Sequence, residues 1–404
     1  MTSELTETDL ADPSFWSLAP QQRLEAFASL RRHDAPVYFG ATGHGFHALV
    51  RHRDVVEASR RPEIFISGPG VTTPRPPRWV RTVFGDSMVN LDDPRHARLR
   101  GVVARAFTPR VVNRITDDVT RVAGAVVDDV IAHRPADFVE AVASRLPFEV
   151  ICTMMGIPPA YRREVLNQIN HTTADAGVRR RLRMPGKSLR ALAKLHCVVG
   201  RVARQRRREP ADDLISALVT AEVDGARLNS RELGSFFSLL LVAGVETTRN
   251  AIAHALHLLT TNPAQRALLA TEFDAHVGGF VDEVVRYSSP IIQFRRTLAR
   301  DHELGGGGRL RAGDDVVLFY TSANRDESVF DRPDDFDITR RPNPHVGFGG
   351  GGPHFCLGTS LARQEMTVLF RELLSRLPQI RSVDEPVLVP SSFDNRVARL
   401  PFAY

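Results

Sequence analysis

Residues 348–358 read FGGGGPHFCLG, and this stretch decides the fold. Its consecutive glycines permit a tight backbone bend, and Pro353 stiffens the chain just before a cysteine. Cys356 is followed by LGTSLARQEM, a sequence that predicts a helix over residues 357–376. The unpaired N–H groups and the positive dipole end at the start of a helix stabilise a thiolate. The stretch therefore predicts a fixed cradle for a charged sulfur.

A single cysteine in such a position is open to three interpretations. It can be a catalytic nucleophile, a metal ligand or an inert core residue, and the core is the commonest place for an unbridged cysteine. A nucleophile needs a nearby base, and His354 lies two residues away but can point elsewhere. The chain has three cysteines, too few for a disulfide framework, which matches a reducing compartment. The other two, Cys152 and Cys197, lie on apolar helical faces and are expected in the core.

The glycine-rich stretch resembles the haem-binding loop of the cytochrome P-450 superfamily, whose pattern is Phe-Gly-x-Gly-x-His/Arg-x-Cys-x-Gly. The resemblance implies that Cys356 is the axial thiolate ligand of haem b and tunes the reactivity of the iron. Phe348 lies eight residues before the cysteine, one more than in the commonest pattern, which leaves its packing open. The FGGGG variant resembles a bacterial subset of the family that acts on sterols and branched lipids.

The longest helix is predicted over residues 230–261. Asn229 can cap its first turn together with Glu232, and Pro263 bars continuation beyond its end. A helix of this length is a rod of roughly 45 Å, long enough to cross a domain. It is therefore expected to be the central helix of the fold.

The middle of this helix carries a second motif. Residues 243–248 read AGVETT, which resembles the family's oxygen-activation motif, Ala-Gly-x-Asp/Glu-Thr. The resemblance implies that Glu246 relays protons from solvent and that the Thr247 hydroxyl hydrogen-bonds the oxygen being activated. Without Cys356, the same residues would be interpreted as an ordinary buried polar patch.

Glu283 and Arg286 form a third motif. Residues three apart share a helix face, and such a pair is usually a surface salt bridge of little energetic value. The pair resembles the family's Glu-x-x-Arg motif, which implies burial and a third member, Arg340. We therefore expect a structural triad that supports folding and takes no part in catalysis.

Haem carries two propionates, and buried carboxylates need cations and hydrogen-bond donors. The resemblance implies four such contacts, from His96, Arg100, Arg296 and His354. His96 and Arg100 are four residues apart on one predicted helix face, and a plain surface pair is the alternative. Arg295 competes with Arg296, and the register of the strand decides between them.

An apolar pocket is expected to receive a hydrophobic small molecule. The residues expected to line it are Ala243, Val245, Ile291, Ile292 and Phe393. The Pro/Gly-rich loop over residues 65–80 is either a lid or a plain connector. The glycine loop and the central helix favour a steroid, terpenoid or lipid-like substrate. An oxidase of secondary-metabolite biosynthesis, acting by hydroxylation or oxidative ring formation, is the alternative.

Together the motifs imply a monooxygenase that inserts one oxygen atom of O2 into its substrate. No electron-transfer domain is recognisable in the sequence, so the expected partners are a ferredoxin and a ferredoxin reductase. Two rival functions differ at the central helix. Peroxide-driven relatives replace the acid and the alcohol that Glu246 and Thr247 provide, and a non-catalytic haem-binding protein needs no proton relay.

The composition is that of a globular protein, with 43% hydrophobic and 25% charged residues in 404. Lysine and arginine exceed the acids by 53 to 47, which favours an acidic protein partner such as a ferredoxin. No nucleic-acid-binding motif is present. The acidic start lacks the pattern of a signal peptide, and the apolar run 236–245 is too short to span a membrane. A cytoplasmic location is therefore expected.

We expect a single domain over residues 1–404, mainly α with a small β region, in the cytochrome P-450 fold around a buried haem. Strands are expected after Pro290, within QFRRTLA, GGGGRLRAG and DDVVLFYTS. Besides the two helices above, helices are predicted over residues 20–32, 52–60, 94–106, 110–133, 138–154, 187–208 and 211–221.

Overall fold

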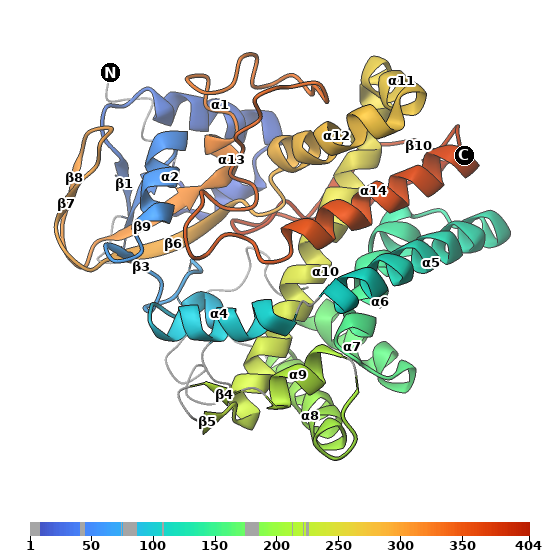
Figure 1. Ribbon diagram of the computed structural model, residues 1–404. Helices are drawn as coiled ribbons and strands as arrows, with labels where there is room; N and C mark the ends of the chain where they lie inside the picture. The colour runs from blue at the N-terminus through green and yellow to red at the C-terminus, as the bar shows by residue number, and fades with distance from the viewer. Residues whose placement is uncertain are drawn as a thin grey trace. The chain divides into compact units, whose positions relative to one another are not determined.

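The structure is a computed structural model that describes residues 9–40, 45–73, 75, 87–106, 109–173, 186–211, 213–220, 222–223 and 226–404. The fold is mainly α with short strands, as predicted (Figure 1). Its contacts divide the chain into two compact units. Unit 1 comprises Met1–Arg75, Thr261–Cys356 and Leu388–Arg396, and unit 2 comprises Pro76–Thr260, Leu357–Val387 and Val397–Tyr404. The expectation of a single domain stays a prediction.

Unit 1 is built around a sheet with the strand order β1-β2-β9-β6-β3. Its strands are β1 (Val37–Phe39), β2 (Phe46–Leu49), β3 (Phe65–Ile66), β6 (Gln293–Leu298) and β9 (Asp315–Phe319), with a separate pair, β7 (His302–Glu303) and β8 (Arg309–Leu310). Its helices are α1 (Pro20–Arg31), α2 (His52–Arg60), α11 (Pro263–Thr271), α12 (Phe273–Ser288) and α13 (Tyr320–Ala323), with a short 3-10 helix, η1 (Pro13–Ser17).

The two faces of this sheet are buried in two separate apolar clusters. Successive side chains of a strand point to opposite faces. Accordingly, Val316 and Leu318 of β9 lie in one cluster, whereas Val317 and Phe319 lie in the other with Trp16. Burial on both faces explains why β9 reads as a continuous apolar run.

The N-terminal strands of the sheet were not part of the prediction. Helical periodicity was expected to dominate up to about residue 288, yet β1, β2 and β3 all come from the first 66 residues. These strands have two to four residues each and carry too little alternation to be read from sequence. Pairing with β6 and β9 makes them strands.

Unit 2 contains most of the long helices. They are α4 (Arg95–Ala106), α5 (Pro109–His133), α6 (Arg145–Met154), α7 (Pro159–Thr173), α8 (Gly186–Arg208), α9 (Leu214–Thr220), α10 (Ser230–Thr261) and α14 (Thr359–Arg376). A 3-10 helix, η2 (Met88–Asn90), and a π-helix, η3 (Val139–Ala143), complete the helical part. The short strands are β4 (Glu222–Val223), β5 (Ala226–Arg227), β10 (Arg381–Ser382), β11 (Val387–Leu388), β12 (Val397–Arg399) and β13 (Phe402–Ala403). In this unit α14 packs along α5, and α5 also packs on α6 (Figure 1).

The central helix α10 has the predicted bounds and the predicted cap. The side chain of Asn229 accepts hydrogen bonds from the backbone N–H groups of Arg231 (2.9 Å) and Glu232 (3.0 Å). Glu232 in turn accepts from the backbone N–H of Asn229 at 3.0 Å. This reciprocal arrangement satisfies donors that have no partner within the helix, and it fixes where the helix begins. Among the described residues, no helix is both long and apolar enough to cross a membrane.

Glu365 is a buried acid on α14. Burial raises the pKa of its carboxyl to about 8, because a charge is costly away from water. The ordinary value is 4.5, so the folded protein holds this proton across a pH range in which the unfolded chain releases it.

Glu365→Gln is therefore expected to flatten the pH dependence of stability. Between about pH 5 and pH 8 only the unfolded carboxyl ionises, so the wild type loses stability as the pH rises, whereas glutamine has no proton to lose. Relative to the wild type, the variant should gain about 2–4 kcal/mol in unfolding free energy over that range. Urea unfolding of the holoprotein at both pH values measures the difference. Glu372→Gln, on the same helix but partly exposed, is the control, and an equal effect of Glu365→Gln at both pH values would contradict the buried proton.

Candidate functional site

The glycine-rich loop before α14 is held in one conformation by its own backbone. The N–H of Cys356 donates to the carbonyl oxygen of Phe348 at 2.9 Å, and the N–H of Gly349 donates to that of Val346 at 2.8 Å. Gly349, Gly351 and Gly352 have φ angles of 102°, 89° and 76°, in the left-handed region that disfavours side chains. The run of glycines is therefore required by the bend that presents Cys356.

Close packing against α2 is a second reason for the glycines. A Cβ at Gly350 would lie 2.6 Å from the Oγ of Ser59, and one at Gly352 would lie 2.1 Å from the Ser59 carbonyl oxygen. These approaches are shorter than any van der Waals contact, so a larger residue would push the loop off the end of α2.

The three cysteines occupy different environments. The Cys356 side chain is exposed, and α14 begins three residues later. Cys152 is buried on α6 as predicted, and burial raises the pKa of its thiol to about 12. The prediction that Cys197 lies in the core is wrong, because its side chain is exposed on α8. The apolar helical face there belongs to its neighbours Val198 and Val199, which are buried.

The pairing of β6 with β9 places the side chains of Arg295 and Arg296 on opposite faces of the sheet. Arg295 lies opposite Val317, and its guanidinium pairs with Asp315. Arg296 lies on the other face of the strand and is buried. Burial raises the pKa of the Tyr320 hydroxyl, and the charge of Arg296 partly offsets this rise, which places the guanidinium close to Tyr320. Arg296 therefore stays the propionate candidate, whereas Arg295 is engaged with Asp315.

His354, the remaining propionate candidate in unit 1, lies in the cysteine loop. Its Nε2 is 3.1 Å from the Oγ of Ser67, a fully buried residue just after β3. Sequence reasoning did not single out Ser67. The contact holds the ring against the segment that begins the predicted 65–80 loop, of which residues 74 and 76–80 lie outside the described residues.

His96 and Arg100, the other two propionate candidates, belong to α4 in unit 2. His96 is buried, with its Nδ1 3.4 Å from Asp93. Burial lowers the pKa of the His96 ring, Asp93 partly offsets this, and the charge of Arg100 lowers the pKa further. Arg100 therefore lies near His96, as their spacing on one helix face predicted.

The oxygen-activation motif lies in the middle of α10. The Thr247 hydroxyl donates to the carbonyl oxygen of Ala243 at 2.6 Å, a bond that loosens and bends helices. Glu246 is buried, and its carboxylate lies 2.6 Å from Nη2 of Arg249. Arg249 was not predicted, although its position three residues after Glu246 is the signal that would have found it.

The expected pocket residues do not all share a face. Ala243 and Thr247 are one turn apart on α10, whereas Val245 lies about 200° around the helix from Ala243 and is buried. In unit 1, Ile291 and Phe294 pack against the same apolar cluster. Ile291 forms an antiparallel bridge with Asp394, and the ring of Phe294 is 5.5 Å from that of Phe393.

Ile292, by contrast, is buried in the apolar cluster around Trp16. The structure thus groups Ala243 with Thr247, and Ile291 with Phe393. It brings neither Val245 nor Ile292 to those groups.

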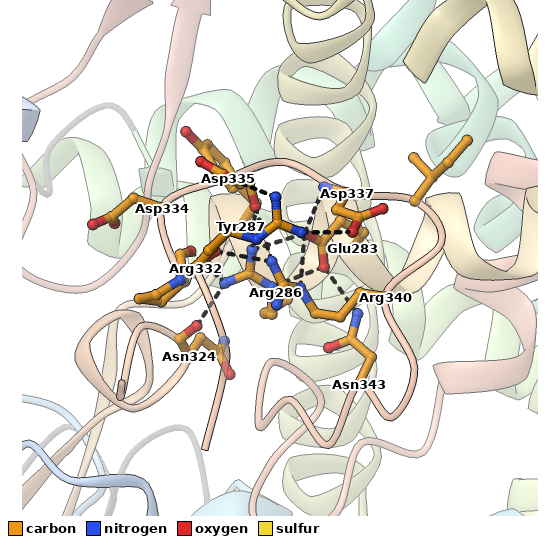
Figure 2. A network of polar contacts seen from close by, with 12 residues as sticks. Glu283, Arg286, Tyr287, Asn324, Arg332, Asp334, Asp335, Asp337, Arg340 and Asn343 are labelled. Atoms are coloured by element: carbon orange, nitrogen blue, oxygen red, sulfur yellow. Dashed lines mark hydrogen bonds and ion pairs between the residues drawn. The ribbon is translucent and has the colours of Figure 1, made fainter. Parts of the chain in front are cut away.

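Glu283 and Arg286 form a buried pair on α12, with both side chains 0% exposed (Figure 2). The guanidinium of Arg286 donates to both carboxylate oxygens of Glu283, at 2.8 and 2.7 Å. Arg340 adds a third bond to Glu283 from its Nε at 3.3 Å. The predicted contact among the three residues is therefore present.

Backbone groups far along the chain complete this network. Arg286 donates to the carbonyl oxygens of Asn324 (2.9 Å), Pro333 (2.8 Å) and Asp335 (3.0 Å). Asn343, which the sequence analysis did not name, donates to Glu283 at 3.0 Å (Figure 2). One arginine thus joins α12 to the long polar segment that leads to the cysteine loop.

These residues fit a haem with a cysteine ligand. Across the described part of the chain, no group of three or more His, Cys, Asp or Glu side chains could hold a metal ion. A haem iron needs no such group, because its porphyrin supplies the other donors and a single thiolate suffices from the protein. Cys356 is an exposed sulfur on a hydrogen-bonded loop, and the buried guanidinium of Arg296 and the buried ring of His96 are donors for the propionates.

Comparison with known proteins identifies the family. Residues 183–379 match the family model of cytochrome P-450. A methyl-branched lipid omega-hydroxylase of Mycobacterium tuberculosis is 44% identical over 99% of this chain and 95% of its own. A steroid C26-monooxygenase of Mycolicibacterium smegmatis is 34% identical over 93% of this chain and 88% of its own. A solved Mycobacterium marinum cytochrome P-450 in complex with pseudoionone is 40% identical, with a TM-score of 0.92 over 98% of both chains. The chain therefore belongs to the cytochrome P-450 family and is a monooxygenase.

Proposed function

We propose that this monooxygenase binds haem b through Cys356 and hydroxylates a long, hydrophobic, lipid-like molecule with electrons from a ferredoxin. One observation carries the proposal: the backbone N–H of Cys356 donates to Phe348 in a tightly bent glycine loop, three residues before α14. When bound, haem supplies the chemistry of oxygen activation. The sulfur of Cys356 would ligate the iron as a thiolate.

His96, Arg100, Arg296 and His354 are proposed to hold the two propionates. His96 and Arg296 are buried, and a buried carboxylate is stable only beside such donors. The contact with Ser67 orients His354 for this task.

Glu246 and Thr247 are proposed to handle protons during the reaction. Glu246 is paired with Arg249 at 2.6 Å, so its carboxylate is balanced while buried and can pass a proton when the pair opens. The Thr247 hydroxyl donates to the carbonyl oxygen of Ala243, which lies one turn earlier on the same face of α10.

The substrate is proposed to be a methyl-branched or steroid-like lipid. Two of the relatives compared above are a methyl-branched lipid omega-hydroxylase and a steroid C26-monooxygenase. The apolar side chains of Ile291, Phe294 and Phe393 in unit 1 support a hydrophobic ligand. The basic excess of the chain supports an acidic ferredoxin as the electron donor.

Absorption spectroscopy of the purified holoprotein tests this proposal. We expect the reduced carbon monoxide complex to show the red-shifted band of a thiolate ligand. Branched long-chain fatty acids or cholesterol derivatives should shift the haem from low to high spin, and a ferredoxin system should yield hydroxylated product. A folded holoprotein without the red-shifted band would contradict the ligand. Turnover with peroxide but none with ferredoxin would contradict the monooxygenase reaction.

Thr247→Ala is expected to uncouple electron consumption from product. Loss of the hydroxyl removes one positioned proton-transfer group, so product per NADH should fall by about tenfold or more while NADH oxidation continues and peroxide rises. Ser238→Ala is the matched control, because Ser238 donates to the Gly234 carbonyl in the same way, at 2.8 Å on the same helix. Unchanged coupling in Thr247→Ala would show that this hydroxyl takes no part in proton transfer.

A further inference from the structure

One face of β6 carries polar side chains that the haem site does not use. Arg295 and Thr297 share this face, whereas Phe294 and Arg296 point to the other. Asp315, at the start of β9, lies directly opposite Thr297. Arg295 and the propionate candidate Arg296 therefore lie on opposite faces of β6.

Two guanidinium groups converge on one carboxylate at this face. Arg295 and Arg75 both pair with Asp315, whose Oδ1 also accepts from the Thr297 hydroxyl at 2.6 Å. Arg75 donates further to the Thr297 hydroxyl at 2.8 Å. The cluster therefore holds two positive charges against one negative charge. Burial first, and then the charge of Arg75, lower the pKa of Arg295 to about 10.

The cluster also has buried donors without acceptors. The Arg295 side chain is 8% exposed, and its Nε–H finds no acceptor in the described residues. The Thr73 hydroxyl is likewise buried and without a partner in that part of the chain. A buried donor left unpaired is costly, and a charged one is more so. An anion bound beside Arg295 would accept from its Nε–H and balance the excess charge, and Thr73, two residues before Arg75, offers a further donor.

The loop that carries Thr73 and Arg75 links this cluster to the cysteine loop. It begins at Ser67, which contacts His354, and its Val71 carbonyl accepts from the Arg295 N–H at 2.8 Å. Arg75 is 39% exposed, whereas Arg295 is buried. The cluster thus has one side open to solvent and one side in the interior.

We propose that Arg75, Arg295 and Thr73 form a subsite for the carboxylate of a fatty acid substrate. This rests on the proposed function, because it assigns the acid end of a lipid whose other end is oxidised. A monoanion matches the single excess charge, whereas a phosphate monoester would carry nearly two charges. A haem propionate offers the same chemistry, but Arg296 and His354 are already assigned to it, and Arg296 lies on the opposite face of β6.

Spin-shift titration of the holoenzyme with a branched long-chain fatty acid and with its methyl ester tests the subsite. The wild type should bind the acid about tenfold more tightly than the ester. Arg75→Gln should weaken acid binding about tenfold and leave ester binding unchanged, whereas Arg75→Lys should keep most of the preference. Arg309→Gln, at an arginine that is 75% exposed and paired with Asp301, is the control and should change neither value.

Three results would overturn the subsite. The first is equal affinity for acid and ester in the wild type, or no spin shift with either. The second is an equal loss for both ligands in Arg75→Gln. The third is a lower haem content in Arg75→Gln with the acid preference intact, which would assign the cluster to a haem propionate. A normal thiolate band and turnover of a neutral sterol would still uphold the proposed function in each case.

Discussion

Cys356→Ser is expected to remove the red-shifted band of the reduced carbon monoxide complex and to lower product formation by at least two orders of magnitude. Even residues that only support a metal ligand cost about 10–100-fold when replaced, so the ligand itself should cost at least that. The serine hydroxyl does not ionise near neutral pH, so it cannot act as the electron-rich ligand that favours O–O cleavage. Product per haem with a ferredoxin system, measured beside the spectrum, checks both effects.

The substitution should leave the loop in place. Serine has nearly the shape of cysteine, and the backbone N–H of residue 356 can still donate to Phe348. Cys197→Ser is the matched control, because Cys197 is an exposed cysteine on α8 and should have no effect on either readout. Retention of the red-shifted band in Cys356→Ser would show that another residue ligates the iron.

Arg286→Ala is expected to lower the free energy of unfolding by about 3–5 kcal/mol, because it leaves Glu283 charged and buried without its bidentate partner. Both side chains are fully buried, and the three carbonyl oxygens that accept from Arg286 would also lose their donor. Urea unfolding of the holoprotein, followed by circular dichroism and by haem absorption, measures the loss.

Arg332→Ala is the control for this prediction. Arg332 lies in the same polar segment and pairs with Asp331 and Asp335, but its side chain is 65% exposed (Figure 2). Its removal should change stability by less than about 0.5 kcal/mol. Equal losses of unfolding free energy in Arg286→Ala and Arg332→Ala would contradict a stabilising role of the buried Glu283–Arg286 pair. For the Arg286 variant that remains folded, turnover per haem should match the wild type, as a structural role requires.

Features coded by neighbouring residues could be predicted closely. The bounds of α10 follow from Asn229, Glu232 and Pro263, which act within a few residues of the helix ends. The predicted helix over 138–154 was less accurate, because the structure has a π-helix that ends at Ala143 and a new helix from Arg145. Pro147 favours the first turn of a helix, and that position is consistent with the break. Helix α7 was not predicted, since its sequence PAYRREVLNQINHTT has few apolar residues to reveal a period.

Features set by packing partners could not be predicted. The sequence did not show that Ile292 joins the cluster around Trp16. The choice between Arg295 and Arg296 needed the pairing of β6 with β9. Each of these outcomes depends on a neighbour far along the chain, and no local pattern encodes it.

The division of each unit into separate segments of the chain also determines when its parts are synthesised. α5 packs against α14, so its partner helix is made only near the end of translation. At about 5–20 residues per second, the roughly 225 residues between the two helices take about 10–45 s to emerge from the ribosome. Cys356 is the last residue of its stretch of unit 1, and Leu357 resumes unit 2. Both units therefore remain unfinished when this point leaves the ribosome, and each is completed only by segments that follow Cys356.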